Sequence, residues 1–185
     1  MLLEGIAESR LDIAFVPLPG QVPEGLSVTV LAREPLTFAC APSHRLADRK
    51  RVALTDLEGE TFVDFQEGWG LRILLDRAFG AARVSRRTAF DVNDVCTLFE
   101  LVAHGLGVAL VPRALNPDPS WGIRHIGLRP PVPMYELALV TARDEPLSRA
   151  AQALLDLMPL EAKPSPSARP LQARGRRTAK AAATA

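Results

Sequence analysis

Short apolar runs alternate along this chain with segments whose apolar residues recur every three or four positions. The runs at 11–17 and 108–112 are mostly apolar, which is typical of strands buried on both faces. Each run ends at a proline, which cannot donate to a sheet. The segments at 67–82 and 91–105 have the spacing of amphipathic helices. This alternation predicts an α/β fold with mostly parallel sheets.

Both helical segments carry a clear apolar stripe. Residues 91–105 offer Asn93 or Asp94 as the N-cap, and Ser148 begins a last helix at roughly 148–158. The stripes consist of Leu71, Leu74, Leu75, Ala78 and Ala82 in 67–82, of Val95, Leu98, Phe99 and Val102 in 91–105, and of Ala151, Leu154, Leu155 and Met158 in the last helix.

The other predicted elements are shorter. An amphipathic helix ends near residue 9, and 26–42 forms two β-rich runs that Arg33–Pro35 separates. A helical turn precedes a strand at 61–65, and further strands lie at 123–128 and 134–142.

Composition is that of a globular protein with a sizeable core: of the 185 residues, 48% are hydrophobic and 23% charged. The net charge of +1 conceals an asymmetry, because residues 163–185 hold six basic groups and no acidic one. The rest has 16 basic against 21 acidic residues. We therefore expect the body of the chain to be a poor binder of nucleic acid by itself.

The end of the chain, 161–185, lacks periodicity and is rich in Pro, Ser, Ala and Arg. This composition predicts a disordered basic tail. The tail has two interpretations, a solvated extension or a nonspecific electrostatic contact with DNA.

Cysteine usage and hydropathy indicate a cytoplasmic protein. Cys40 and Cys96 lie in apolar segments and are predicted to be buried free thiols. Glu4 and Glu8 stand where a signal peptide needs basic and apolar residues, and no apolar run approaches the roughly 20 residues that span a bilayer. We expect no membrane partner.

The stretch "LVAHGLGVALVP" (101–112) holds the glycine pair Gly105 and Gly107. A dinucleotide fingerprint needs a third glycine, where Leu110 stands, and a turn from strand into helix, whereas here a helix precedes a strand. Two interpretations stay open: a helix cap without ligand contact, or a cap that also borders a ligand cleft.

Catalytic and metal-binding patterns are absent from the sequence. His44, His104 and His125 are widely spaced, and neither C-x-x-C, H-E-x-x-H nor G-x-S-x-G occurs. His44 reads as a structural turn residue. We therefore predict no catalytic residue, no metal and no cofactor.

The stretch "VDFQEGWGLR" (63–72) is the strongest candidate for ligand binding. A strand ends near Phe65 and a helix begins near Gly70, so free backbone amides face the carboxyl end of the strand. Arg72 would add a cation and Trp69 an apolar wall for a ligand with a carboxylate or similar anion. The competing interpretation is an exposed loop whose Trp packs on a neighbouring helix. The predicted lining residues are Asp64, Gln66, Trp69, Gly70, Leu71 and Arg72.

Two further strand ends add candidates. Pro17 and Leu18 follow a buried strand at its ligand-facing end, and Asn93 follows another. For Asn93, capping of the next helix is the competing explanation.

The order of these elements resembles the effector-binding domain of LysR-type transcriptional regulators. The matching pieces within residues 2–158 begin with "LLEGIAESRLDIAFVPLP" and include "PLTFACAPSHRLADR", "LVAHGLGVALVP" and "ELALVTARDEPLSRAAQALLDLM". The resemblance implies two Rossmann-like lobes, as in periplasmic binding proteins, with a small-molecule effector between them. It assigns 1–60 and 123–160 to lobe I and 61–122 to lobe II, and it makes the 63–72 loop an effector contact.

The resemblance also implies elements that this sequence does not contain. A winged helix-turn-helix, a linker helix and the first βα unit of lobe I would precede Leu2. We therefore expect an N-terminally truncated fragment with an incomplete lobe I, which reaches DNA only through the missing N-terminal domain and self-associates as a dimer or tetramer in the intact protein.

Two other functions share this two-lobed design. A solute-binding protein of a transporter is the main alternative, and an α/β enzyme such as a dehydratase is the third. A helix-turn-helix upstream would favour the regulator, a signal peptide the carrier, and turnover the enzyme.

Overall fold

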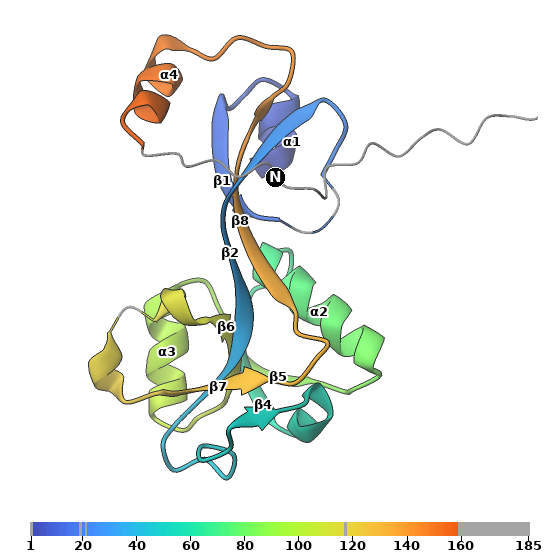
Figure 1. Ribbon diagram of the computed structural model, residues 1–185, viewed down its shortest axis with the longest axis vertical. Helices are drawn as coiled ribbons and strands as arrows, with labels where there is room; N and C mark the ends of the chain where they lie inside the picture. Colours follow the sequence, from blue (N-terminus) through green and yellow to red (C-terminus); the bar gives the residue numbers. More distant parts are fainter. Residues whose placement is uncertain (1, 19, 21, 117, 159–185) are drawn as a thin grey trace, which may run out of the picture.

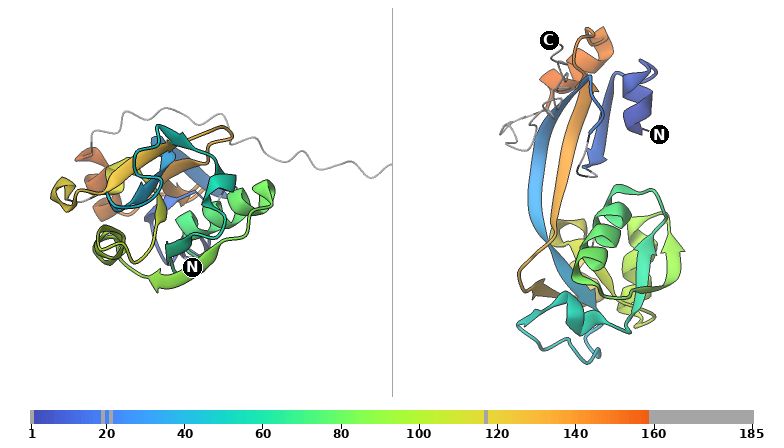
Figure 2. Two further views of the ribbon diagram at one scale, coloured as in Figure 1. Left: turned by 90° about the horizontal axis from the view of Figure 1, so that it is seen from below. Right: turned by 90° about the vertical axis from the view of Figure 1, so that its right-hand side faces the viewer.

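Two lobes joined by two long antiparallel strands make up the computed structural model, which describes residues 2–18, 20, 22–116 and 118–158 (Figure 1). The connecting strands are β2 (Leu26–Cys40) and β8 (Met134–Ala142). They pair from Leu26↔Ala142 to Pro35↔Met134 and run side by side through the waist of the molecule (Figure 2).

The smaller lobe is built on an antiparallel sheet in the order β1–β8–β2. Its other elements are α1 (Leu2–Ala7), β1 (Ile13–Pro17) and α4 (Arg149–Asp156). A compact apolar cluster holds them together, formed by Ile6, Ala14, Val16, Leu26, Ala138 and Val140.

The larger lobe contains the remaining elements around the second half of β2, which pairs antiparallel with both β6 and β7. Strands β4 and β5 pair in parallel, and a bridge from Phe62 to Val108 links β4 to the start of β6. The elements are β3 (Arg51–Val52), η1 (Leu54–Leu57), β4 (Thr61–Phe65), α2 (Gly70–Ala82), β5 (Arg87–Val92), α3 (Val95–Ala103), β6 (Ala109–Pro112), η2 (Arg113–Leu115), η3 (Pro119–Trp121) and β7 (Arg124–Leu128).

The locally encoded elements are confirmed. Helix α2 buries Leu71, Leu75 and Phe79, and the other members of the predicted stripe, Leu74, Ala78 and Ala82, pack beside them and are partly buried. Helix α3 begins at Asp94, whose carboxylate accepts a hydrogen bond of 2.8 Å from the Thr97 N–H. Ser148 caps α4 in the same way.

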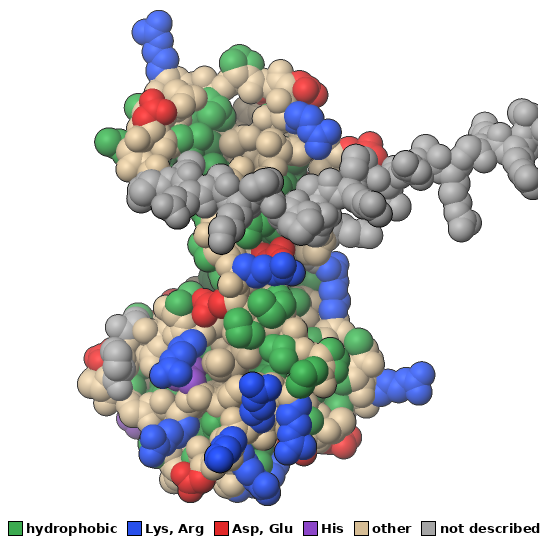
Figure 3. Space-filling model, viewed as in Figure 1, with side chains coloured by type: hydrophobic (Ala, Val, Ile, Leu, Met, Phe, Trp, Pro, Cys, Tyr) green, Lys and Arg blue, Asp and Glu red, His purple; other side chains and the backbone are tan. Residues whose placement is uncertain are grey.

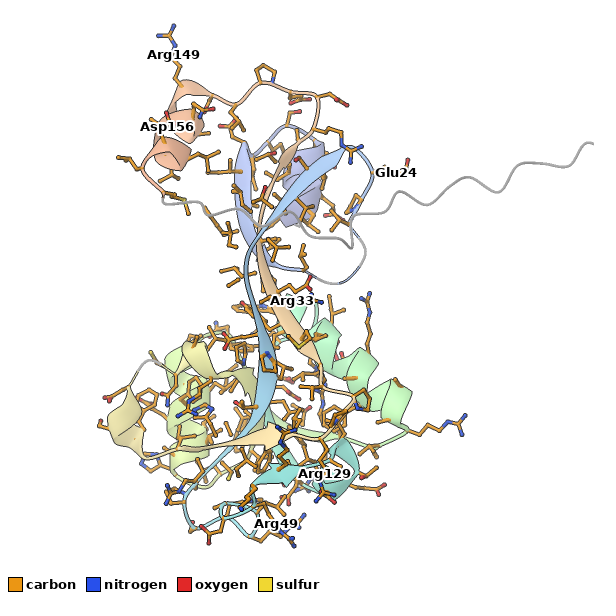
Figure 4. All side chains as sticks on the ribbon, viewed as in Figure 1. Glu24, Arg33, Arg49, Arg129, Arg149 and Asp156 are labelled. Carbon is orange, nitrogen blue, oxygen red and sulfur yellow. The ribbon has the colours of Figure 1, made fainter. Side chains whose placement is uncertain are left out.

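The predicted break at Arg33–Pro35 is wrong, because β2 continues through it. Pro35 pairs with Met134, and Arg33 faces Glu136 on β8 in an ion pair of 2.7 Å. Figure 4 places Arg33 at the waist. Proline has no backbone N–H to donate, and this local signal favours a strand break. Pairing with β8, about a hundred positions later, overrides it.

The prediction of mostly parallel sheets is also wrong. Strands β1, β6 and β7 all run antiparallel to a connecting strand, and parallel pairing is confined to β3–β7, β4–β5 and the Phe62–Val108 bridge in the part of the chain described here. A strand that passes from one lobe to the other can pair with its neighbours in parallel or antiparallel orientation. The alternation of helices and strands along the sequence does not encode which orientation occurs.

Burial in the smaller lobe is lower than the sequence predicts. β1 alternates between buried and exposed residues, and Phe15 is 39% exposed. On α4, Ala151 is buried, whereas Leu154 is 45% exposed. Among the described residues, β1 is an edge strand that pairs with β8, and most side chains of α4 are exposed.

The two core clusters divide the chain differently from the predicted lobes. The larger cluster includes Leu36, Phe38, Leu57, Ile126 and Leu128. Segments before residue 61 and after residue 122 that we assigned to lobe I therefore pack with 61–122. The physical reason is that β2 and β8 cross the waist near Pro35 and Met134, so the chain changes lobes within strands rather than at loops. The predicted tail at 161–185 lies outside the described residues.

The two cysteines differ in burial. Cys40 is fully buried, and burial raises the pKa of its thiol to about 11. Cys96 is exposed in the first turn of α3, so the prediction that it is buried is wrong. It stands outside the stripe of Leu98, Phe99 and Val102 that packs on the core.

We expect one thiol of the folded chain to react rapidly with a disulfide reagent such as DTNB, and the second only after denaturation. The thiolate is the reactive form, and Cys40 is both inaccessible and held protonated. Colorimetric titration of native and urea-treated chain measures the two classes, with Cys96→Ser as the control that should remove the fast one. Two fast thiols would contradict the packing of β2.

Candidate functional site

The lobes touch where β1 ends and α2 begins. A Cβ placed on Gly70 would lie 2.8 Å from the Pro17 Cβ and 2.8 Å from the Pro17 carbonyl oxygen, so glycine permits this close approach. The next residue, Leu18, donates its N–H to the Glu136 carbonyl oxygen at 2.8 Å. Of the two predicted residues, Pro17 therefore lies against Gly70 at the start of α2, whereas Leu18 packs on the apolar cluster of the smaller lobe beside this contact.

The first turn of α2 presents uncapped amides at this contact. Trp69 is the N-cap residue and gives no side-chain hydrogen bond. The first N–H groups of a helix have no partner within the helix, so they and the helix dipole attract anions.

Trp69 forms a wall beside these amides. Its ring stacks on Phe65 with centroids 5.3 Å apart and an interplanar angle of 1°, and it is 41% exposed. The competing interpretation placed this indole against a neighbouring helix, whereas here it packs on the end of the preceding strand. Trp69 thus keeps exposed surface that is open to another contact.

Gln66 and Asn93 follow the adjacent parallel strands β4 and β5. The Gln66 N–H donates to the Val92 carbonyl oxygen at 3.1 Å, and both side chains are exposed. Asp94, not Asn93, caps α3, so capping does not account for Asn93. We call Pro17, Leu18, Gln66, Trp69 and Gly70 together the lobe junction, with Asn93 at its edge.

The Asp94 cap gives a pH-dependent prediction. Hydrogen bonds from Thr97 lower the pKa of Asp94 below its ordinary value of 3.8. A lowered pKa in the folded state means that the carboxylate contributes stability above pH 3.8, and that this contribution is lost as the pH falls through the folded pKa.

We expect Asp94→Asn to melt slightly below the wild type at neutral pH, by no more than a few degrees, since Asn also caps helices but lacks the charge. The gap should close as the pH falls below 3.8. Thermal unfolding by circular dichroism from pH 7 to pH 3 measures it. A gap that widens in acid would contradict the assigned cap.

Asp64 lies under α2 instead of lining the junction. Its side chain is fully buried, accepts a hydrogen bond of 2.7 Å from Thr88 Oγ1 and pairs with Arg86 Nε at 3.3 Å. Burial raises the pKa of the Asp64 carboxyl, although Arg86, Thr88 and Arg72 act in the opposite direction. The predicted lining role of Asp64 is not supported, because β4 turns this side chain toward α2.

The side chains of Leu71 and Arg72 likewise contact other parts of the protein. Leu71 is 4% exposed in the core. The Arg72 guanidinium donates to Asp91 at 2.7 Å, to Asp76 at 3.2 Å and to the Phe65 carbonyl oxygen at 3.1 Å. Arg72 therefore fastens the first turn of α2 to β4 and β5. Its positive charge, which we predicted to meet the ligand, is paired with carboxylates of the protein itself.

The glycine pair closes α3 and packs β6 on β4. Gly105, at φ 71°, donates its N–H to Val102, and Leu106 donates to Leu101, both at 3.0 Å, which is a Schellman motif. A Cβ on Gly107 would lie 2.9 Å from Val63 Cγ2 and 3.0 Å from the Thr61 carbonyl oxygen. The structural interpretation accounts for both glycines without a ligand.

The histidines have structural partners. His44 lies 3.2 Å from a Glu60 carboxylate oxygen, and His125 bonds to Thr37 at 3.0 Å. Burial lowers the pKa of His125. Among the described residues no three His, Cys, Asp or Glu side chains are grouped to hold a metal ion. Nor does any described helix have the length and apolar character to cross a membrane.

A cavity of about 660 Å³ lies away from the lobe junction, between α2 and the segment that joins β7 to β8. None of the predicted lining residues borders it. We did not predict this cavity, although the small residues of α2 and the Pro-Pro-Val-Pro segment at 130–133 are visible in the sequence.

A family model described as the LysR substrate binding domain matches residues 1–161. The chain belongs to the LysR substrate-binding domain family. This result confirms the resemblance drawn from the residues and the two-lobed α/β fold that it implies.

Curated relatives of the LysR type agree. The chain is 32% identical over 157 residues to "Uncharacterized HTH-type transcriptional regulator YwbI" of Bacillus subtilis, with 83% of this chain and 51% of that protein covered. It is 30% identical over 160 residues to "Hydrogen peroxide-inducible genes activator" of Dickeya chrysanthemi, covering 84% and 51%. The chain thus spans about half the length of the curated relatives it matches.

Solved structures show the same fold. The effector-binding domain of QuiR in complex with shikimate superposes with a TM-score of 0.71 at 19% identity, covering 84% of this chain and 73% of that one. The CcmR regulatory domain of Synechocystis PCC6803 in complex with 2-PG gives 0.72 at 19% identity, covering 84% and 75%. The reduced form of OxyR gives 0.64 at 29% identity, covering 84% and 73%.

These LysR-type matches decide between the two-lobed alternatives. The named relatives are transcriptional regulators, and the similar structures are regulatory or effector-binding domains. The solute-binding protein of a transporter is therefore set aside.

Proposed function

We propose that this chain is the effector-sensing part of a LysR-type transcriptional regulator, and that it binds a small anionic metabolite at the lobe junction. The observation that carries this proposal is the contact of Pro17 with Gly70, which brings the end of a strand in one lobe against the uncapped first turn of α2 in the other. A ligand held there touches both lobes at once.

The effector would act by shifting a conformational equilibrium. A ligand that binds one arrangement of the lobes better than another shifts the population toward it. The connecting strands β2 and β8 are the hinge in this proposal. The effector is bound and released unchanged, so the chain has no catalytic function.

The rest of the proposal concerns the whole regulator, in the cytoplasm. DNA contact belongs to the parts of such regulators that this chain does not cover, and the regulator self-associates as a dimer or tetramer. Two similar domains are in complex with shikimate and 2-PG, and we take both as probes because they are small anions.

A thermal-shift panel of small carboxylates and phosphates that includes shikimate and 2-PG tests the site. We expect a stabilising compound whose affinity falls about tenfold or more in Gln66→Ala, the loss of a hydrogen bond to a charged group. The matched control is Gln152→Ala, an exposed glutamine of α4 that bonds to Asp156. Equal affinity in both variants would place the ligand elsewhere.

A further inference from the structure

The cavity of about 660 Å³ is an open groove on the larger lobe. It is lined by residues of α2, by the segment 129–133 and by Ala53, Leu54 and Thr55 at the start of η1. The lining residues are Ala53, Leu54, Thr55, Leu74, Arg77, Ala78, Ala81, Ala82, Arg129, Pro130, Pro131, Val132 and Pro133. We call this the proline groove.

The proline groove is lined almost entirely by small apolar side chains. On α2, Leu74, Ala78 and Ala82 follow at intervals of four, so they form one stripe beside the buried stripe that includes Leu75 and Phe79. Opposite them stand Pro130 to Pro133, which cannot fill the space with long side chains. Its volume of about 660 Å³ is within the range of small-molecule sites.

Charge in the groove has one sign. Arg77 and Arg129 are its charged lining residues, Thr55 is the uncharged polar one, and none of the described lining residues is acidic. Arg77 also reaches the smaller lobe, because a Cβ on Gly20 would lie 2.6 Å from its Nη1. Figure 3 shows hydrophobic side chains on this lobe with Lys and Arg beside them, and Figure 4 places Arg129, an exposed residue, on the same lobe.

The groove is separate from the lobe junction. The junction uses the first turn of α2, while the groove uses residues 74–82, and Arg72 and Asp76 occupy a third face of the helix with the Asp64 network. The groove also borders Pro133, whose carbonyl oxygen accepts from Leu36 at the waist crossing. A ligand in it would contact the chain just before β8 begins.

We propose that the proline groove is a second ligand site, which takes an amphiphilic anion with a flat or extended apolar body and one carboxylate. The apolar body lies between α2 and Pro130–Pro133, because burying apolar surface there is favourable. The carboxylate is held by the Arg129 guanidinium, whose fork-shaped donors match carboxylate geometry.

The test is calorimetric titration of the 185-residue chain with 2-naphthoate, and with the neutral 2-naphthamide as the matched ligand. We expect 2-naphthoate to bind, and 2-naphthamide to bind more weakly. Arg129→Gln should weaken 2-naphthoate about two- to fivefold, as expected of one exposed charge pair, and should remove the difference between the two ligands. Arg49→Gln, an equal charge change on the same lobe outside the groove, should have no effect (Figure 4).

A second pair of variants keeps the test independent of Arg129. Ala81 is an exposed helix position that lines the groove, so Ala81→Glu and Ala81→Gln differ only in charge. We expect Ala81→Glu to bind 2-naphthoate at least about fivefold more weakly than Ala81→Gln, because like charges repel, and melting curves confirm that both fold.

Three outcomes would overturn the proposal. In the first, 2-naphthoate and 2-naphthamide bind equally. In the second, the Ala81 pair binds alike, while Gln66→Ala abolishes binding, so that the ligand occupies the lobe junction. In the third, no ligand binds and Ala81→Glu changes the sedimentation of the chain, so that a second copy covers the groove.

Discussion

Replacing Asp64 by alanine is expected to lower the free energy of unfolding by about 3–5 kcal/mol. The Arg86 side chain is 6% exposed, and its Nε pairs with Asp64 at 3.3 Å. Without Asp64 the guanidinium stays buried beside Phe62 and Phe79 with the half-exposed Asp76 as its other carboxylate. Urea unfolding of the wild type and the variant measures the loss.

Two variants separate this effect from a general loss of charge. Asp76→Ala removes a carboxylate that is 54% exposed and pairs with the same arginine, and it should cost about 1 kcal/mol or less. Asp64→Leu combined with Arg86→Met replaces the buried pair by apolar side chains and should recover most of the stability. If Asp64→Ala lowered the free energy of unfolding no more than Asp76→Ala, the Asp64 carboxylate would not be the main partner of the buried Arg86.

Replacing Gly107 by valine is expected to cost about 2–3 kcal/mol through overpacking. The new Cβ would meet Val63 Cγ2 at 2.9 Å and the Thr61 carbonyl oxygen at 3.0 Å, and the latter belongs to backbone that cannot rotate away. Thr61 also accepts the Val108 N–H at 2.8 Å, so the substitution pushes β6 from β4. Chemical denaturation followed by circular dichroism measures the cost.

Gly80→Ala is the matched control for that substitution. Gly80 lies in α2, and an added Cβ there has no heavy atom within 4 Å. Alanine is a better helix former than glycine, so this variant should be more stable by about 0.5–1 kcal/mol. A loss at Gly80 as large as at Gly107 would mean that backbone freedom, and not close packing, decides the effect.

Sequence-local signals predicted much of this fold. The apolar spacing of 67–82 and 91–105, the caps at Asp94 and Ser148 and the helix end at Gly105 each depend on residues within one or two turns. Such short-range patterns are set by backbone geometry alone, so they survive in the folded chain.

Long-range pairing decided what the sequence did not predict. β2 runs unbroken through Arg33–Pro35 because β8 lies beside it. The buried Asp64 is bonded by Thr88, which follows 24 positions later on β5, and by Arg86, which directly precedes β5. The chain order also hides the contact of Pro17 with Gly70. Residue type at a strand end thus indicates a region where a ligand could bind, but not which side chains there are free to meet it.

Trp69 fluorescence tests the proposed site most directly. Trp121→Phe leaves Trp69 as the sole indole of the chain, since the sequence holds two tryptophans. We predict that a small anion that raises the melting temperature of this variant also changes the Trp69 emission, with the same dissociation constant in both measurements. A ligand that stabilises the chain but leaves the Trp69 emission unchanged at saturation would contradict binding at the lobe junction.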